Sequence, residues 1–558
     1  MARIPRTVVF WGAGATASLG FRVTDDQSRF LRRLAPRPDV DRPLRQRVRR
    51  ALGNVPARWK HALHDLLAIL GDNGRNADHN TRVDIVTTGQ LRAMQRSLPG
   101  ADARWRRARI AQLRTLYDWP ALVAAINICP GAPVARAPAV DRFGLRDLFN
   151  LLDMHQQSGH GFRARDRTFL SPERVRAARN ALGLLLQVLA YIDWHTCRGS
   201  AVGQHHLHLH RDFARALSRR VQERGIALAD STEREADLEK PGFVLTDVGF
   251  VSLNWDPVGL WSQFVANREY NDPRRAPQIG PRNASLLSYH DLGHFVAGPR
   301  VEKPHAGSPV WQPMNESSAR QLNDPKHGAD IRVRVTKYLF PHGCLWWREC
   351  PNCGKLSSFI GDAWMVDSRT LLPPPPLARF SHGIAFKPWG DQVDEEGAWD
   401  RGEVDARACV HCGTLTYAHH TPLVTQTTVK SRPPPFLEEI QRDMRVVVED
   451  ADHIVLMGYS LPPDDVTYRA FLAARVRRSD RDPVRCSVIG KEAGYPPRWL
   501  SRSDIDAYVR VPRAVAAARA LFRPENVRFY GAGVPNVFLE DDRVTDAAVD
   551  RLLTWSDY

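Results

Sequence analysis

A short apolar segment that ends in a glycine turn stands at the start of the chain and limits the folds open to it. Residues 7–11, with the sequence TVVFW, are all β-branched or aromatic, and Gly12-Ala13-Gly14 follows directly. Such a run, bounded by glycine, is typical of a buried β-strand. Small residues continue through Thr16 and beyond, so the pattern predicts a strand, a turn and then a helix. This is how an α/β domain with a parallel sheet begins.

Apolar segments typical of further strands return in the second half of the chain. They lie at residues 243–253, 454–458, 486–489 and 527–530, and the stretches between them are long enough for crossover helices. This alternation predicts an α/β fold with a doubly wound parallel sheet. We expect the sheet domain to comprise residues 1–30 and 240–535, with residues 536–558 as a C-terminal helical tail.

A long helical block interrupts the predicted sheet domain. Residues 31–239 are rich in Arg, Ala and Leu at helical spacing, and prolines break the pattern repeatedly. The clearest helices are expected at residues 172–197 and 205–225. At 558 residues the chain is too long for one compact core. The block is therefore predicted to be a large helical insertion or subdomain.

Two C-x-x-C pairs predict a small metal-held module within residues 340–430. Cys350 and Cys353 form the first pair, Cys409 and Cys412 form the second, and a glycine follows each. Four thiolates in a tetrahedron suit zinc, and such a closed site is structural rather than catalytic. Loose surface thiols or a redox pair are the alternatives. Other cysteines and histidines are less well spaced as ligands or are expected to be buried as small hydrophobes: Cys344, His411, Cys129, Cys197 and Cys486.

The glycine loop is a candidate phosphate-binding turn. Its residues Gly12, Ala13, Gly14, Ala15 and Thr16 follow the first strand, where backbone N–H groups at the start of a helix bind a pyrophosphate in many nucleotide-binding folds. The loop lacks the spacing of the common G-x-G-x-x-G fingerprint. A turn that only packs a helix against the sheet is the alternative.

Polar residues follow three other predicted strands or apolar runs. Asn254 and Asp256 come after the strand predicted at 243–253, His342 follows an apolar run at 338–340, and the strand at 454–458 ends in the segment Gly458-Tyr-Ser460-Leu461. Ligands of open α/β sheets bind beyond the carboxyl ends of the strands. The alternatives are an Asx turn at Asp256, a structural histidine, and a plain turn before a capped helix.

Taken in order, these segments resemble the SIR2 (sirtuin-related) family, and most closely its divergent bacterial branch. Gly12 to Thr16 is similar to the family's phosphate loop, and Ser252-Leu-Asn254-Trp-Asp256 to its T-x-N-x-D strand end. His342-Gly343 is similar to its catalytic H-G, which in the bacterial branch runs directly into the first zinc pair. Gly458-Tyr-Ser460-Leu461-Pro is similar to a segment near the adenosine half of NAD.

The resemblance implies a Rossmann-like NAD-binding domain that carries a structural zinc and cleaves the bond between nicotinamide and ribose. It implies that Asn254 orients the ribose and the attacking water, that His342 takes a proton, and that Asp256 holds the ribose side of the pocket. The glycine loop, with Gly458, Ser460 and Leu461, would bind the rest of NAD. Leu253 replaces a glutamine of the deacylases, which favours the bacterial enzymes that hydrolyse NAD in antiviral defence. The alternatives are an NAD-dependent protein deacylase and a noncatalytic NAD or ADP-ribose sensor.

Charge and hydropathy bear on partners and location. The formal net charge is +16, which favours acidic partners, so nucleic acid is one candidate and simple solvation of basic helical faces is the other. The longest apolar run after the N-terminus, residues 181–192, is shorter than the roughly 20 residues of a membrane helix. We therefore expect a cytoplasmic protein without a membrane anchor. An NAD hydrolase that was always active would poison its host, so a homo-oligomer or a regulatory protein partner is expected.

Overall fold

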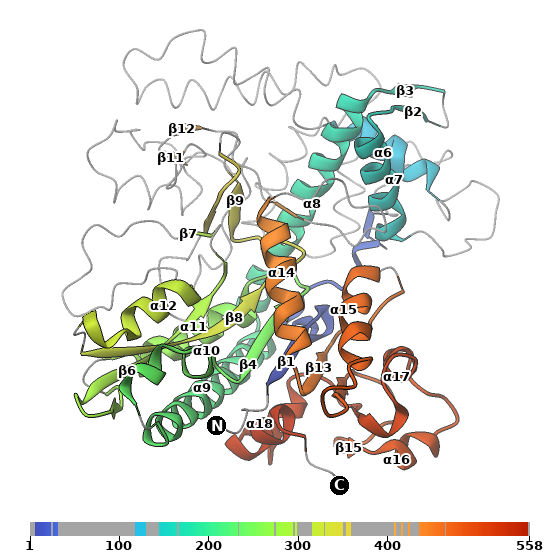
Figure 1. Ribbon diagram of the computed structural model, residues 1–558. Coiled ribbons are helices and arrows are strands. Elements are labelled where there is room, and N and C mark those ends of the chain that lie inside the picture. Colours follow the sequence, from blue (N-terminus) through green and yellow to red (C-terminus); the bar gives the residue numbers. More distant parts are fainter. Residues whose placement is uncertain are drawn as a thin grey trace.

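The computed structural model describes residues 6–31, 118–129, 144–297, 315–358 and 435–555 with a few small gaps, and the short stretches 407–408, 415–416 and 422–423. The chain is organised around one nine-stranded sheet (Figure 1). Its strands run in the order β15 (Trp499–Leu500), β16 (Val527–Tyr530), β14 (Arg485–Ile489), β13 (His453–Met457), β1 (Thr7–Trp11), β4 (Val248–Ser252), β8 (Ile331–Leu339), β6 (Ala284–Asp291) and β5 (Gln278–Ile279). Neighbours pair in parallel except at the two outer strands, β15 and β5. The expected α/β class with a large, mostly parallel sheet is confirmed.

The register of the central strands brings their carboxyl ends to one level. Trp11, the last residue of β1, lies opposite Met457 of β13 on one side and Ser252 of β4 on the other. Every residue of β1, β4 and β13 is buried, as expected for interior strands of a sheet covered on both faces. The segments that follow these three strands therefore emerge side by side at one edge of the sheet.

Two long strands, β6 and β8, were not predicted from the sequence. Residues 331–339 of β8 contain Arg332 and Arg334, so the segment looks half polar, yet both arginines are almost completely buried. The guanidinium of Arg334 donates to the carbonyl oxygens of Phe243 and Val221, each at 2.8 Å. Tertiary hydrogen bonds thus satisfy the donors of the buried guanidinium group. In the sequence alone, the two arginines argue against a buried strand.

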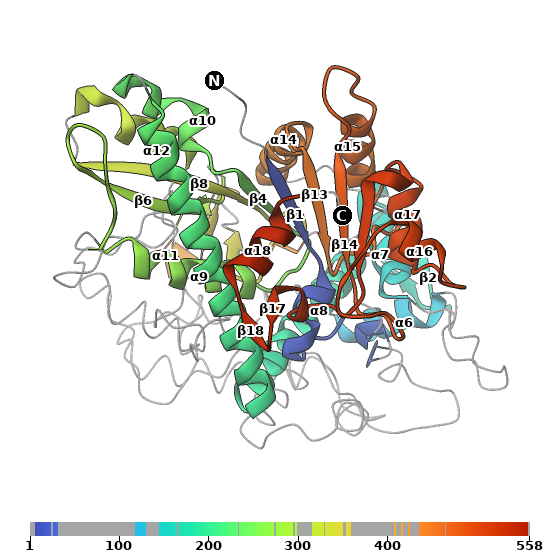
Figure 2. The same cartoon turned by 90° about the horizontal axis from the view of Figure 1, so that it is seen from below.

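Helices cover both faces of the sheet. Figure 2 shows α14 (Pro435–Glu449) and α15 (Val466–Val476) on one side, and α9 (Ala201–Asp230) and α18 (Asp546–Leu553) on the other. Helix α11 (Val258–Tyr270) packs against α9. Shorter helices complete the layers: α10 (Pro241–Val244), α12 (Glu316–Asn323), α16 (Arg502–Asp506) and α17 (Arg513–Arg519). A mostly parallel sheet with helices on both faces is the result.

The described part of residues 31–239 divides between two cores. Helices α6 (Trp119–Ile128), α7 (Leu145–Ser158) and α8 (Pro172–Arg198) form a separate hydrophobic core, which we call the helical block, together with a hairpin of β2 (Phe162–Arg163) and β3 (Phe169–Leu170). Helix α9 instead packs into the main core through Leu207, Phe213 and Leu217. The helices expected at 172–197 and 205–225 are therefore present, but the second belongs to the sheet domain.

Residues 536–558, expected to be a helical tail, fold differently in their described part. A 3₁₀ turn (Asn536–Phe538) and a hairpin of β17 (Leu539–Glu540) and β18 (Arg543–Val544) precede α18. The Phe538 ring stacks on Phe213 of α9 with centroids 4.1 Å apart, and the Thr7 hydroxyl donates to the carbonyl oxygen of Leu553 at 2.6 Å. The segment is an integral layer of the sheet domain because it joins α9 to the start of β1.

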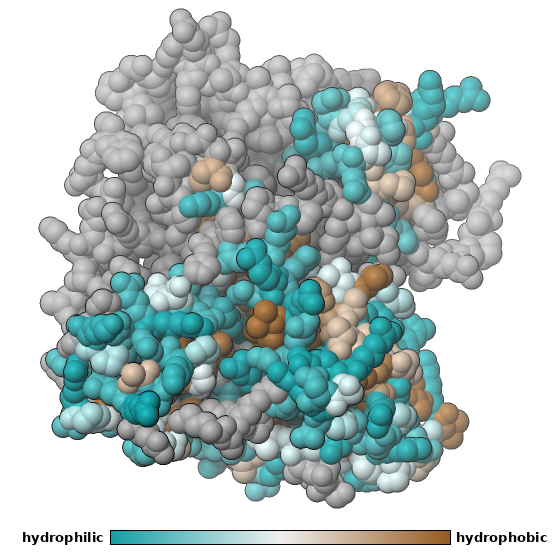
Figure 3. Space-filling view, viewed as in Figure 1, coloured by the Kyte–Doolittle hydropathy of each residue, from teal (hydrophilic) through white to brown (hydrophobic). Residues whose placement is uncertain are grey.

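Across the described residues of the face in Figure 3, hydrophilic side chains predominate, and apolar ones are exposed singly or in small groups. The large apolar side chains that are more than a third exposed include Phe169, Val202, Val466 and Val509. They lie on different elements, in the β2–β3 hairpin, on α9, on α15 and near α17. Scattered exposure of this kind is ordinary for a protein surface.

Candidate functional site

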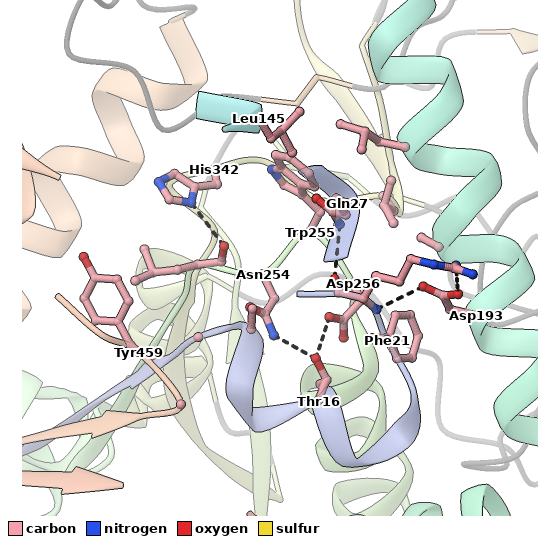
Figure 4. Close-up of a pocket in the computed structure, with 18 of the residues that line it drawn as sticks. Thr16, Phe21, Gln27, Leu145, Asp193, Asn254, Trp255, Asp256, His342 and Tyr459 are labelled. Carbon is pink, nitrogen blue, oxygen red and sulfur yellow. Dashed lines mark hydrogen bonds and ion pairs between the residues drawn. The ribbon is translucent and has the colours of Figure 1, made fainter. Parts of the chain in front are cut away.

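A cavity of about 1010 Å³, open mouth included, lies where the central strands end and the helical block approaches them (Figure 4). Eight residues expected at an NAD site line it: Gly12, Ala13, Thr16, Asn254, Asp256, His342, Gly458 and Ser460. Segments that are hundreds of residues apart in the sequence thus meet at one cavity.

The glycines at the strand ends allow two loops to touch through their backbones. A Cβ atom added at Gly12 would lie 2.5 Å from the carbonyl oxygen of Gly458. Gly458 has a φ of +62°, and a Cβ atom there would lie 2.2 Å from the Ala15 nitrogen. Such distances exclude any side chain. The glycines are therefore required for packing between the loops, a role that the nucleotide-binding interpretation did not anticipate.

Much of the hydrogen-bonding capacity of the glycine loop is used inside the protein. The Gly12 N–H donates to Met457 at 2.9 Å, the Gly14 N–H to Gly458 at 3.0 Å, and the Ala15 N–H to Gly12 at 2.9 Å. Gly14 and Ala15 do not line the cavity. The N–H groups of Gly12, Gly14 and Ala15 are thus already hydrogen-bonded within the protein, and of the five residues of the loop Gly12, Ala13 and Thr16 line the cavity.

The glycine loop does not continue directly into an α-helix, since α-helical residues first appear at 26–28 in the described structure. Two 3₁₀ turns, at Ala13–Ala15 and Ala17–Leu19, follow β1, and the second ends at Gly20 with a φ of +85°. A 3₁₀ turn aligns fewer peptide dipoles than an α-helix. The loop consequently offers a weaker anion site than the strand-turn-helix prediction implied.

A chain of buried hydrogen bonds joins three polar residues in the cavity wall (Figure 4). The Asn254 side-chain amide donates to the Thr16 hydroxyl oxygen at 3.1 Å, and that hydroxyl donates to Asp256 at 3.1 Å. The Val258 N–H donates to the other carboxylate oxygen of Asp256 at 3.2 Å. The sequence pointed to Thr16 for its backbone alone, whereas its side chain orients both Asn254 and Asp256.

The carboxyl group of Asp256 is held in an environment that disfavours its charge. Burial raises its pKa to about 6, although the hydrogen bonds from Val258 and Thr16 act in the opposite direction. A carboxylate with a pKa near 6 changes charge close to neutral pH. Asp256 is therefore suited to interact with a group whose charge changes during a reaction.

His342 lies beyond β8 with its imidazole ring in the cavity wall (Figure 4). Its Nδ1 atom lies 3.1 Å from the carbonyl oxygen of Leu253. A carbonyl oxygen only accepts hydrogen bonds, so Nδ1 carries the proton, and in the neutral ring Nε2 is the basic nitrogen. Gly343 has a φ of +75°, and a Cβ atom there would lie 1.9 Å from the Pro422 carbonyl oxygen. The glycine after the histidine is thus required by the path of the chain.

The segment after β13 contributes to the cavity only in part. Ser460 is exposed and lines the cavity with Gly458. Leu461, which was expected to contribute to binding, is fully buried in the main core with a φ of +50° and does not line the cavity. Tyr459, which sequence reasoning missed, lines the cavity instead, and its hydroxyl donates to Asp465 at 2.5 Å.

The helical block supplies a wall that sequence reasoning did not predict. Leu145 and Phe149 of α7 and Leu186 and Ala190 of α8 line the cavity opposite the sheet. Trp255 stands between Asn254 and Asp256 in the sequence. Its ring contacts the Phe149 ring edge-on, with centroids 6.2 Å apart. These residues follow ordinary amphipathic helical spacing, so nothing in the sequence marks them as cavity residues.

The buried Asp193 and the partly exposed Arg22 form an ion pair at the end of the cavity nearest to α8 (Figure 4). Besides the contact between the two charged groups, the Arg22 backbone N–H donates to Asp193 at 3.0 Å. Burial raises the pKa of Asp193 to about 6, although Arg22 favours its ionised form. Sequence analysis missed this pair, and the one signal that could have found it is a carboxyl group directly after the apolar run 181–192.

The four predicted zinc ligands fall largely outside the described residues. Only Cys353 lies within them, half-buried, and no group of three potential metal ligands occurs among them. The strands around each C-x-x-C pair are informative. β9 (Trp347–Glu349) and β10 (Leu356–Ser358) pair antiparallel across the first, and β11 (Arg407–Ala408) and β12 (Leu415–Thr416) across the second. In the sequence, each cysteine pair thus lies between two strands that pair antiparallel.

The remaining cysteines behave as expected for small apolar side chains. Cys129, Cys197 and Cys486 are buried, and burial raises the pKa of both Cys129 and Cys197 to about 12. A thiol with so high a pKa is neither a ready nucleophile nor a ready metal ligand.

No protein-family model matches the chain, and no curated protein matches its sequence. Among the helices in the described ranges, none combines the length and apolar character required to cross a membrane.

Proposed function

We propose that this protein is a SIR2-like enzyme that hydrolyses NAD to nicotinamide and ADP-ribose. The observation that carries the proposal is the convergence of Thr16, Asn254, Asp256 and His342 at one cavity. They come from three segments that follow β1, β4 and β8. The cavity lies at the carboxyl ends of parallel strands, where open α/β sheets bind their ligands.

The proposed chemistry requires a positioned sugar and one proton acceptor. Cleavage of the nicotinamide–ribose bond develops positive charge on the ribose, and water or a ribose hydroxyl must lose a proton. Nε2 of His342 is the basic nitrogen of its ring, because Nδ1 donates to Leu253. Asn254 is held by Thr16 and is suited to orient the ribose and the attacking water. Asp256, ionised above its raised pKa of about 6, would stabilise the positive charge.

The apolar wall from the helical block supports the same proposal. Side chains of α7 and α8 and the ring of Trp255 cover the cavity from the side opposite the strand ends. Limiting bulk water strengthens the interaction of Asp256 with developing charge. It also leaves Asn254 and His342 to select which water molecule attacks.

Zinc, held by Cys350, Cys353, Cys409 and Cys412, would have a structural role and take no part in the reaction. On this proposal the protein acts as a defence effector that consumes NAD, in the manner of the bacterial enzymes it resembles. Its activity then needs a trigger, for which we propose assembly of several copies or binding of a regulatory protein. NAD is the substrate in either case.

The test is to incubate the purified full-length protein with NAD at neutral pH, with and without phage-infected cell extract, and to separate the products by chromatography. We expect nicotinamide and ADP-ribose to be released in equal amounts. His342→Ala should reduce the rate by roughly 10²- to 10⁴-fold, the usual contribution of a general base. His208→Ala, which removes an exposed histidine of α9, is the matched control and should leave the rate unchanged.

Two other results would point elsewhere. Binding of NAD without any turnover, equal in both histidine variants, would favour a noncatalytic NAD sensor. Nicotinamide release that depends on an acylated peptide, with O-acyl-ADP-ribose as the product, would favour a deacylase.

A further inference from the structure

The glycine loop alone offers few donors for the diphosphate of a dinucleotide. Three of its backbone N–H groups, those of Gly12, Gly14 and Ala15, already donate to carbonyl oxygens of the protein. A diphosphate brings two negative charges, and a cavity that excludes water must compensate them with donors or cations of its own. The cavity therefore needs anion-binding groups beyond the loop to which the sequence pointed.

Two arginines line the cavity from different parts of the fold. Arg22 lies in the segment after the glycine loop, and Arg146 lies in the first turn of α7 in the helical block. Arg146 also lowers the pKa of Tyr459, against the larger effect of burial, so its charge acts toward the segment that follows β13. Arginine residues thus line the cavity from both the sheet domain and the helical block.

Arg22 is held in place by the helical block. Asp193 of α8 accepts a hydrogen bond from the Arg22 backbone N–H at 3.0 Å and also forms an ion pair with its guanidinium group. A second link lies nearby, because the Ser28 hydroxyl accepts a hydrogen bond from the Leu145 N–H at 2.8 Å. The segment that carries Arg22 is therefore fastened to both α7 and α8.

We propose that Arg22 and Arg146 together bind the diphosphate of the ligand, and that Asp193 is a positioning residue for Arg22. A guanidinium group has five N–H donors, so one that pairs with Asp193 keeps others for phosphate oxygens. This inference rests on the proposed function. The inference extends the proposed function, because the diphosphate is then bound between the sheet domain and the helical block rather than by the glycine loop alone.

The proposal is tested by titrating the full-length protein with ADP-ribose and with adenosine in a calorimeter. Adenosine lacks the diphosphate but shares the base and one ribose. We expect Arg22→Gln and Arg146→Gln each to weaken ADP-ribose binding about 10- to 100-fold, the usual effect of losing hydrogen bonds to a charged group. Adenosine binding should change less than about threefold. Arg163→Gln, in the exposed β2–β3 hairpin, is the matched control and should not alter either affinity.

A double-mutant cycle separates positioning by Asp193 from a general effect on the fold. Asp193→Asn should weaken ADP-ribose binding in the natural protein but have almost no further effect in the Arg22→Gln background. Additive losses would contradict the positioning role. Retained adenosine binding shows that each variant is folded.

The outcomes distinguish this inference from the proposed function. If the natural protein binds and hydrolyses NAD while both arginine variants bind ADP-ribose normally, the diphosphate assignment is wrong and the hydrolase proposal stands. If the natural protein binds neither NAD nor ADP-ribose, both are wrong.

Discussion

At the scale of single residues, the cavity is built from polar groups that orient one another. Thr16 is the clearest case, because one hydroxyl accepts from Asn254 and donates to Asp256. Asp256 and Asp193 both have pKa values raised to about 6 by burial. Carboxyl groups that are held at a cost in stability inside a cavity are typical of functional sites.

The raised pKa of Asp256 predicts how stability depends on pH. The folded state binds the proton more tightly than the unfolded chain, where an aspartate titrates at 3.8. This carboxyl group is therefore neutral in both states below about pH 4. Its contribution to the free energy of unfolding falls as pH rises from about 4 to 6. Above that range the contribution stays unfavourable, by on the order of 2–3 kcal/mol. Denaturant unfolding measures the free energy of unfolding of Asp256→Asn and of the natural protein at pH 4 and at pH 7. From pH 4 to pH 7, the variant should gain stability relative to the natural protein by this amount. Parallel pH dependences for the two proteins would contradict the assignment.

At the scale of elements, the sequence predicted the interior strands well and their surroundings poorly. The runs at 7–11, 454–458 and 486–489 are continuous and apolar, and each is a strand. β8 was not predicted because only the fold supplies the partners of its buried arginines: Glu235 pairs with Arg332, and backbone carbonyl oxygens accept from Arg334. The candidate residues after the strands could be named because polar side chains and glycines stand out there. The wall from α7 and α8 could not, since its residues differ in nothing from other amphipathic helices.

The contact between the loops after β1 and β13 makes a prediction about its glycines. Gly458→Ala places a methyl group within 2.2 Å of the Ala15 nitrogen at a positive φ, so it should destabilise the fold by about 2–4 kcal/mol and disrupt the cavity. Gly183→Ala is the matched control. This glycine lies within α8 with nothing within 4 Å of its added Cβ atom, so the change should stabilise the protein by about 0.5–1 kcal/mol. Chemical denaturation measures both, and equal effects would contradict the packing role of Gly458.

At the scale of the whole molecule, the sheet domain and the helical block have separate cores that share one residue. Trp255 packs against both, and its neighbours in the chain are Asn254 and Asp256. Arg22 and Asp193 join the same two units at the other end of the cavity. A shift of the helical block would thus move residues at both ends of the cavity at once. This gives a physical route by which a partner or a second copy bound to the block would control the proposed activity.

The proposed zinc module would be a third unit of the molecule, and its prediction concerns metal content. If the two hairpins close around one ion, the purified protein should contain one zinc per chain, and removing it with a strong chelator should unfold the module and lower the melting temperature. Cys353→Ser should abolish zinc binding, because a hydroxyl group does not replace a thiolate ligand. Cys129→Ala, which removes a buried thiol from the core of the helical block, should keep the full zinc content. Metal analysis by mass spectrometry decides the matter. Equal zinc in the two variants, or none in the natural protein expressed with added zinc, would show that the hairpins are held by contacts other than a metal.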